Sequence, residues 1–156
     1  TKMSNFCIEC NCRINYDEYK YSTNFFGVPL CRPHQSWIKK MEYETTEETI
    51  RLYFALKKRE VPAQLEKYDG FKHIDIAVPE AKINIEVDGI HHNFNSTQAL
   101  RDLKRTYHSF LKGYYTLRIP NSLVRNDSFL DETANFIVKI LNENYDNINK
   151  KNFYDQ

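Results

Sequence analysis

Residues 72–92 read KHIDIAVPEAKINIEVDGIHH, and this stretch decides the fold of the chain. Apolar and polar residues alternate over residues 71–78 and again over residues 82–88, which predicts two strands, each with one apolar face. The short break at residues 79–81 lets these strands pair as a hairpin. The face opposite the apolar one then carries three carboxylates: Asp75, Glu86 and Asp88.

The segments on either side of this hairpin predict an α/β fold. They follow the order helix and strand before it, and helix, strand and helix after it. A capping box formed by Thr45 and Glu48 would begin the first helix, which must end before Pro62. The other expected elements are a strand over 61–68, a helix over 96–112 capped by Ser96, a strand over 114–119 and a helix over 129–144. We expect the Asn-rich end, residues 142–156, to fray.

The composition excludes several classes of protein. With 156 residues, 41% of them hydrophobic and 14% aromatic, the chain can bury a core and is not disordered. No apolar run approaches the roughly 18 residues that span a bilayer, and no secretory signal opens the chain, so we expect a cytoplasmic protein. Because 22 Lys and Arg nearly balance 21 Asp and Glu, contact with nucleic acid would depend on local basic groups. Three such groups are present: Lys39-Lys40, Lys57-Lys58-Arg59 and Arg101/Lys104/Arg105.

All four cysteines lie within the first 31 residues of the chain. In a reducing cytoplasm, cysteines favour metal binding over disulfides. Two pairs have the spacing of metal ligands, Cys7-x2-Cys10 and Cys31-x2-His34, and together they would complete a tetrahedral zinc site. Cys12 is a fifth candidate that could replace one ligand. Four filled positions indicate a structural zinc, since a catalytic zinc keeps one position open.

Residues 1–44 contain no apolar segment long enough for a core, so zinc binding would stabilise their fold. They resemble a treble-clef zinc finger, in which a hairpin joins a first knuckle to a second knuckle that opens a helix. We therefore expect a zinc-binding module over residues 1–44 and a larger domain over residues 45–156. Buried, reduced cysteines without a metal are the alternative.

The carboxylates opposite the apolar face have two interpretations. On an exposed sheet face, they would simply be solvated. If they converge, they repel one another unless one is protonated or a cation binds. All-oxygen ligation suits Mg²⁺ or Mn²⁺ better than zinc, so convergence would predict a second metal site.

The wider sequence favours convergence. The residues that carry this argument are Asp75-x10-Glu86-x-Asp88-Gly89-x2-His92, followed by Asp102-x2-Arg105. This ordered set resembles the restriction-endonuclease-like PD-(D/E)XK superfamily, in its very-short-patch-repair-like (Vsr-like) branch with the scattered EDxHD signature. The resemblance covers about residues 45–124. It implies a restriction-endonuclease-like αβββαβ core, Mg²⁺-dependent endonuclease activity, DNA as substrate and a bacterial or phage context.

The resemblance also assigns roles to the matching positions. Asp75 and Glu86 correspond to the two acidic metal ligands. Asp88 stands where many members carry lysine, which leaves open which group activates the water. His92, or its neighbour His91, would act as a general acid or contact the phosphate.

Further roles fall on two predicted helices. Asp102 and Arg105 lie three residues apart on one helix face, so Asp102 could reach the metal or the histidine and Arg105 the phosphate. The first-helix glutamate of the signature corresponds to Glu47 or Glu48. Glu48 could instead serve only as a helix cap.

Together these features predict a metal-dependent endonuclease that hydrolyses DNA phosphodiester bonds. It would hold Mg²⁺ or Mn²⁺ at the carboxylates and a structural zinc in the N-terminal module, which would also contact nucleic acid. Two alternatives remain: a non-catalytic zinc-finger nucleic-acid-binding protein, and an RNA-cleaving nuclease of the same fold. One metal site cuts one strand, so cutting both strands would need a homodimer or two binding events.

Overall fold

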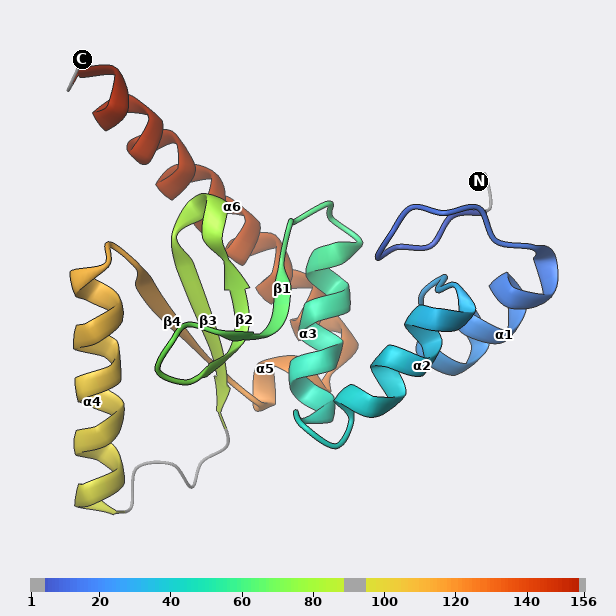
Figure 1. The fold of residues 1–156 in the computed structure, drawn as a ribbon, viewed down its shortest axis with the longest axis horizontal. Helices are drawn as coiled ribbons and strands as arrows, with labels where there is room; N and C mark the ends of the chain where they lie inside the picture. Colours follow the sequence, from blue (N-terminus) through green and yellow to red (C-terminus); the bar gives the residue numbers. More distant parts are fainter. Residues whose placement is uncertain (1–4, 89–94, 155–156) are drawn as a thin grey trace. The chain divides into compact units, whose positions relative to one another are not determined.

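A computed structural model describes residues 5–88 and 95–154 (Figure 1). The chain divides into two compact units, Thr1–Glu47 and Glu48–Gln156. Within the described ranges, no helix combines the length and the apolar character needed to cross a membrane.

The first unit is built on two helices, α1 (Tyr16–Phe26) and α2 (Arg32–Met41). The Asn15 side chain caps α1 by accepting a hydrogen bond from a first-turn amide at 2.9 Å. Gly27 ends the helix in the left-handed region, at φ 76°, where a residue without Cβ is favoured. The sequence therefore fixes both ends of α1 locally.

The prediction of a hairpin between the two cysteine knuckles is wrong. Helix α1 occupies most of that interval, and the β pairing described within this unit is one antiparallel bridge between Phe6 and Arg13. The physical reason lies at the start of α1. There the Asn15 cap is followed by Asp17 and Glu18, whose negative charges favour a helix N-terminus.

A buried serine joins α1 to the loop that precedes α2. The Ser22 hydroxyl donates to the Val28 carbonyl at 2.6 Å and accepts from the Leu30 amide at 2.8 Å. The Gln35 side chain donates to the Leu30 carbonyl at 2.9 Å. Since Ser22, Val28 and Leu30 are all buried with Ile38, these bonds hold the small core of this unit together.

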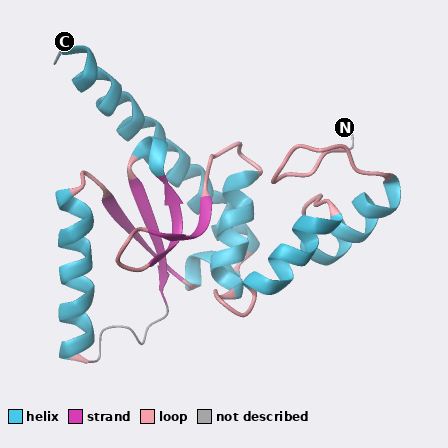
Figure 2. Cartoon of the chain, in the orientation of Figure 1, coloured by secondary structure: helices cyan, strands magenta, loops and turns pink. Residues whose placement is uncertain are grey.

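The second unit is a mixed four-stranded sheet with helices packed against it (Figures 1 and 2). Its elements are α3 (Glu47–Lys57), β1 (Gln64–Tyr68), β2 (His73–Val78), η1 (Pro79–Ala81), β3 (Ile83–Asp88), α4 (Ser96–Leu111), β4 (Tyr115–Pro120), α5 (Ser122–Arg125) and α6 (Asp127–Tyr154). The strands lie in the order β1-β2-β3-β4, antiparallel up to β3, with β4 parallel to β3. The predicted mixed α/β class is confirmed.

One face of the sheet is apolar and forms the core of the second unit. It carries six buried side chains: Ile74, Ile76, Val78, Ile83, Ile85 and Val87. Buried residues of α3 and α6 complete this core, among them Leu52, Leu56 and Ile137. The burial of these apolar side chains is the main contribution to the stability of the sheet.

The opposite face of the sheet is polar and lies next to α4. Alternation along β2 and β3 places Asp75, Asn84 and Glu86 on this face. The Asn84 amide lies 3.5 Å from the Ser109 hydroxyl of α4, and both residues are buried. The helix therefore covers the face on which the carboxylates stand.

Two helix starts differ from the expected ones by one residue. Helix α3 begins at Glu47, so Thr45 does not immediately precede it and Glu48 is not its third residue. Helix α4 is capped by Asn95 rather than Ser96, because the Asn95 side chain accepts a bond from an amide of the first turn at 2.9 Å.

The start of β1 and the end of α6 also differ from the expected positions, and proline or its absence explains both. Strand β1 begins at Gln64, later than expected, since Pro62 has no amide to donate to a strand ladder. Helix α6 continues to Tyr154, beyond its expected end at residue 144. Residues 127–154 contain neither glycine nor proline, and nothing in them breaks the helix.

The Ser22 bonds give a prediction for the first unit. The substitution Ser22→Ala should lower the free energy of unfolding of this unit by about 1 to 3 kcal/mol, because a buried carbonyl and a buried amide lose their partner. Urea unfolding followed by the fluorescence of Trp37, the only tryptophan, measures this. Thr23→Ala is the matched control, since the Thr23 hydroxyl bonds only carbonyls of its own helix. Equal effects of the two substitutions would contradict the role of Ser22.

Candidate functional site

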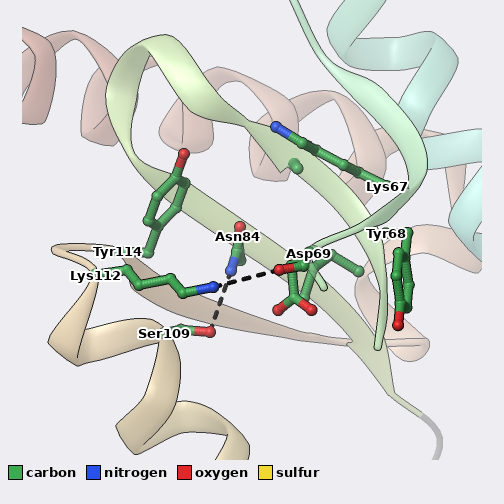
Figure 3. A pocket seen from close by; sticks show the side chains of 9 residues that line it. Lys67, Tyr68, Asp69, Asn84, Ser109, Lys112 and Tyr114 are labelled. Carbon is green, nitrogen blue, oxygen red and sulfur yellow. Dashed lines mark hydrogen bonds between the residues drawn. The ribbon is translucent and has the colours of Figure 1, made fainter. Parts of the chain in front are cut away.

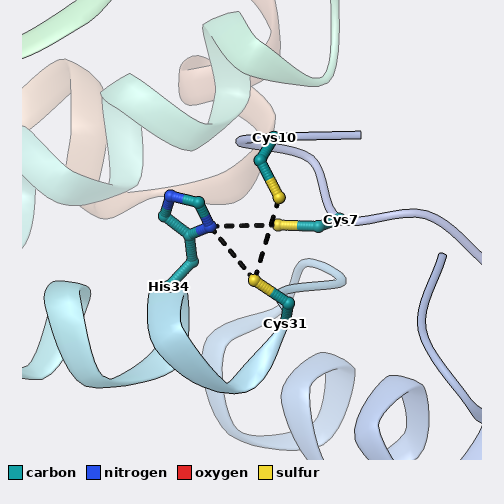
Figure 4. Close-up of side chains that lie close together, drawn as sticks. All are labelled: Cys7, Cys10, Cys31 and His34. Atoms are coloured by element: carbon teal, nitrogen blue, oxygen red, sulfur yellow. Dashed lines mark hydrogen bonds between the residues drawn. The ribbon is translucent and has the colours of Figure 1, made fainter. Parts of the chain in front are cut away.

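Four side chains of the first unit form a cluster with the donor set of a zinc site (Figure 4). Their ligand atoms all lie within 4.8 Å of one another, and the residues are Cys7, Cys10, Cys31 and His34. The Sγ atoms of Cys10 and Cys31 are 3.9 Å apart, and His34 Nδ1 lies 3.6 Å from Cys7 Sγ. Because zinc–sulfur bonds of about 2.3 Å place two tetrahedral sulfurs about 3.8 Å apart, one zinc ion fits this cluster. The predicted Cys3His group is confirmed.

Local backbone structure positions both halves of the cluster. The first knuckle closes through bonds from the Cys7 amide to the Cys12 carbonyl and from the Asn11 amide to the Cys7 carbonyl, both 2.9 Å. Asn11 takes a left-handed conformation there, at φ 59°. In the second knuckle, Cys31 is the N-cap residue of α2, and His34 lies in the first turn. Cys12 contributes its backbone carbonyl to this knuckle, its thiol is hydrogen-bonded to Cys10, and it is not one of the four clustered ligands.

The thiols of the cluster ionise unequally. Hydrogen bonds from the backbone and side chain of Cys12 lower the pKa of Cys10 to about 6, whereas burial raises the pKa of Cys31 to about 12. A thiolate is the form that binds metal, so Cys31 needs a bound cation to lose its proton at neutral pH. A zinc ion would supply that charge.

The cluster predicts which cysteines matter for metal binding. Cys31→Ser should abolish stoichiometric zinc binding and unfold the first unit, because zinc binding energy stabilises this small fold. Cys12→Ser is the control, and it should retain one zinc per chain and the folded Trp37 fluorescence. Zinc content after dialysis, measured by mass spectrometry, tests both. Loss of zinc from Cys12→Ser would place Cys12 among the ligands.

In the second unit, Asp75 and Glu86 face each other across strands β2 and β3. The ladder pairs Ile76 with Ile85, which places Asp75 opposite Glu86 on the polar face. The paired register ends there. Beyond it, Asp75 Oδ2 accepts a bond from the Val87 amide at 2.9 Å, in place of a backbone carbonyl. The carboxylate of Asp75 is therefore held in position by the neighbouring strand.

Burial makes these two carboxylates hard to ionise together. Burial is the main cause that raises the pKa of Asp75. Burial and the adjacent Asp75 charge raise the pKa of Glu86 to about 7, although the Lys72 ammonium lies 2.9 Å from Glu86 Oε1. A divalent cation would relieve the repulsion, and carboxylate oxygens are the ligands that Mg²⁺ and Mn²⁺ prefer. The donor set fits such a cation, with water or substrate oxygens completing its coordination.

Glu66 is a third acidic residue at this position, and it was not identified from the sequence. It lies on β1 between Leu65 and Lys67, which pair with Ile76 and Ile74, so it stands opposite Asp75. Its charge also raises the pKa of Asp75. Alternation over residues 64–68 separates Glu66 from Leu65, but only the pairing of β1 with β2 brings it opposite Asp75.

Asp88 does not join the other two carboxylates. Its Oδ2 accepts a bond from Arg118 Nη1 at 2.9 Å, across the parallel pairing of β3 and β4. Over residues 5–88 and 95–154, the Cys3His cluster is the only group of three or more candidate ligands close enough to hold one ion. Of the three carboxylates expected to converge, only Asp75 and Glu86 do so. Asp88 pairs with Arg118 instead.

Asp102 and Arg105 lie together on α4, as their spacing predicts, and they form an ion pair with each other. Asp102 is buried, and the Nε of Arg105 is buried with no hydrogen-bond partner in the described part of the chain. Ser109, two turns further along α4, meets Asn84 of β3. Since two turns span about 10 Å and β3 runs antiparallel to α4, the pair lies near the level of Glu86. An unpaired guanidinium donor at that level can bind an anion.

The remaining predicted residues are accounted for differently. Glu48 accepts a bond from Arg125 Nε at 3.0 Å, and a bond from its own amide together with Arg125 lowers its pKa. This pair links α3 to α5. Glu47 is exposed at the start of α3. His91 and His92 lie outside the described residues.

A cavity of about 240 Å³ opens on the polar side of the sheet (Figure 3). Its lining includes two lysines and two tyrosines: Lys67, Lys112, Tyr68 and Tyr114. Asn84 points into it, and this residue precedes Glu86 by two positions on the same strand face. The lining also includes Asp69 and contains neither Asp75 nor Glu86, and its two lysines give it a net positive charge.

The fold is shared with a solved structure, the catalytic domain of the homing endonuclease I-Bth0305I. The TM-score is 0.52 at 17% sequence identity, and the match covers 64% of this chain and 98% of that domain. At this identity, the likeness establishes the fold. No family model matches the sequence, and no curated protein does.

The pKa of Glu86 gives a prediction for stability. Its folded pKa of about 7 lies above the ordinary 4.5, so the folded chain binds this proton more tightly than the unfolded chain does. Without added divalent cations, stability should therefore fall by at most about 3 kcal/mol as pH rises from 4.5 to 7. Urea titrations of zinc-loaded protein at pH 5, 6, 7 and 8 measure this.

Two controls accompany the pH titration. Glu86→Gln should flatten the profile over this range, because the titrating group is gone. Saturating Mn²⁺ should restore the stability of the wild type at pH 8. A wild-type stability that rises steadily from pH 5 to 8 would contradict the assignment.

Proposed function

We propose that this protein is a divalent-metal-dependent endonuclease that hydrolyses DNA phosphodiester bonds. The observation that carries the proposal is the pair of adjacent carboxylates, the half-buried Asp75 and the buried Glu86, in a fold shared with a homing endonuclease catalytic domain. We also propose that the protein belongs to the Vsr-like branch of the PD-(D/E)XK superfamily. Its αβββαβ core would then run from α3 to β4.

The carboxylates would hold Mg²⁺ or Mn²⁺, which supplies Lewis acidity to a water molecule and to the scissile phosphate. Asp75 is suited to this task because the Val87 amide fixes its orientation. Hydrolysis forms a bond from the water oxygen to phosphorus, with loss of one water proton to solvent, and breaks a phosphorus–oxygen bond, whose leaving oxygen takes up a proton. His92 or His91 is the proposed source of that proton.

Arginines next to the carboxylates would stabilise the negative charge that develops on the phosphate. Arg105 has a buried Nε without a partner in the described chain, and a guanidinium suits phosphate oxygens. Asp102 would orient Arg105, and Asp88 would orient Arg118, through their ion pairs. The lysines of the cavity that Asn84 lines would hold the flanking nucleic-acid backbone, which makes binding salt-dependent.

The first unit would contribute to nucleic-acid binding through an aromatic surface. The exposed rings of Tyr21 and Phe25 stack with centroids 5.7 Å apart, and the Lys39 ammonium lies 5.6 and 5.4 Å from those centroids. Exposed rings beside a lysine can stack on bases and contact phosphate. This observation also favours the second candidate function, a zinc-stabilised nucleic-acid-binding protein without cleavage.

Cleavage assays distinguish these candidates. Single- and double-stranded DNA and RNA should be incubated with the wild type and with Mg²⁺, Mn²⁺ or no divalent cation. We expect divalent-dependent nicking of DNA, reduced at least about 100-fold in Asp75→Asn and in Glu86→Gln, because each removes a metal-binding charge. Asp131→Asn is the control, since Asp131 is an exposed residue of α6 that pairs with Arg59, just after the end of α3.

Each other outcome has a defined meaning. Cleavage that persists in both carboxylate variants would remove the metal role of Asp75 and Glu86. Cleavage restricted to RNA would make the protein a ribonuclease of the same fold. Binding to any of these nucleic acids without cleavage under either cation would support the non-catalytic candidate.

A further inference from the structure

The ammonium of Lys72 lies in the carboxylate site. Its Nζ lies 2.9 Å from Glu86 Oε1, and the two side chains are 17% and 10% exposed. This is the most buried ion pair that the structure describes with a lysine. The site therefore contains its own cation, on the residue that directly precedes the strand carrying Asp75.

The backbone of Lys72 is fixed by the turn that precedes β2. Asp69 Oδ1 accepts from the Phe71 amide at 2.8 Å and from the Lys72 amide at 2.7 Å. The Asp69 amide donates to the Lys72 carbonyl at 3.0 Å. Gly70 completes the turn at φ 94°. The main chain of Lys72 is thus held rigidly, whereas its four-carbon side chain can move the ammonium among several acceptors.

The ammonium and a divalent cation compete for one oxygen. A cation bound to Glu86 Oε1 would repel an ammonium held at the same atom, so Lys72 must move when the metal binds. The position where the resemblance places a lysine holds Asp88, whose partner is Arg118. A lysine is nevertheless present at the carboxylates, and it comes from the turn before β2 instead of from β3.

We propose that Lys72 is the phosphate-binding cation of this site. Its ammonium neutralises Glu86 in the metal-free protein and transfers to the scissile phosphate when a divalent cation takes Glu86. This inference rests on the proposed function. The Lys72–Glu86 pair contributes little net stability to the fold, since the cost of desolvating both charges offsets most of their attraction. Stability alone therefore does not explain its presence.

The proposal makes metal affinity and cleavage change in opposite directions. Lys72→Met keeps most of the side-chain length and removes the charge. Mn²⁺ should then bind the carboxylates about tenfold more tightly, because no ammonium has to be displaced. Cleavage at saturating Mn²⁺ should fall about 100-fold, because the phosphate loses a fixed cation.

Calorimetry with Mn²⁺ at pH 8 on zinc-loaded protein measures the affinity, and nicking of plasmid DNA measures the cleavage. The Asp75→Asn variant defines the carboxylate component of the Mn²⁺ binding. Lys72→Arg keeps the charge and should keep the wild-type affinity within about twofold, with partial cleavage. Lys139→Met is the charge-matched control, since Lys139 is exposed and lies 4.9 Å from the Phe136 ring of α6. Lys72→Gln is the second uncharged variant if Lys72→Met does not fold.

The outcomes separate this inference from the proposed function. If the wild type binds Mn²⁺ and cleaves, and Lys72→Met does both equally well, the role of Lys72 is overturned and the nuclease stands. Weaker Mn²⁺ binding in folded Lys72→Met would make Lys72 purely structural and also overturn it. A wild type without Mn²⁺ binding at the carboxylates overturns both proposals.

Discussion

The second unit depends on an electrostatic constraint, the placement of two carboxylates on the buried polar face of its sheet. Asp75 and Glu86 stand opposite each other where β2 and β3 stop pairing, and burial disfavours the charged form of each. Neighbouring groups compensate part of this cost, the Val87 amide at Asp75 and the Lys72 ammonium at Glu86. The arrangement costs stability as it stands. A sheet selected for stability alone would carry apolar residues here, so the constraint points to chemistry.

The architecture around this pair was largely predictable from local patterns. Alternation over residues 71–78 and 82–88 predicted both strands and their apolar face, and the observed ladder pairs Ile76 with Ile85. The first-unit hairpin was not predicted correctly, because the Asn15 cap and the Gly27 stop define a helix that periodicity did not reveal. Short-range caps decided that segment, whereas hydrophobic alternation decided the sheet.

The site was less predictable than the fold, because side-chain partners depend on tertiary packing. Spacing alone gave the Cys3His cluster, since each ligand pair closes through one tight turn. Spacing also suggested three converging carboxylates, but Arg118 of β4 pairs with Asp88. Lys72 and Glu66 were missed because their approach to Asp75 and Glu86 follows from strand register. No local sequence signal fixes register before the strands are paired.

The most direct measurement of the central claim is anomalous diffraction from a crystal soaked in Mn²⁺. The account predicts a manganese peak within about 2.5 Å of carboxylate oxygens of both Asp75 and Glu86, with the Lys72 ammonium displaced from Glu86. Manganese bound elsewhere only, with Lys72 still seated on Glu86, would contradict it.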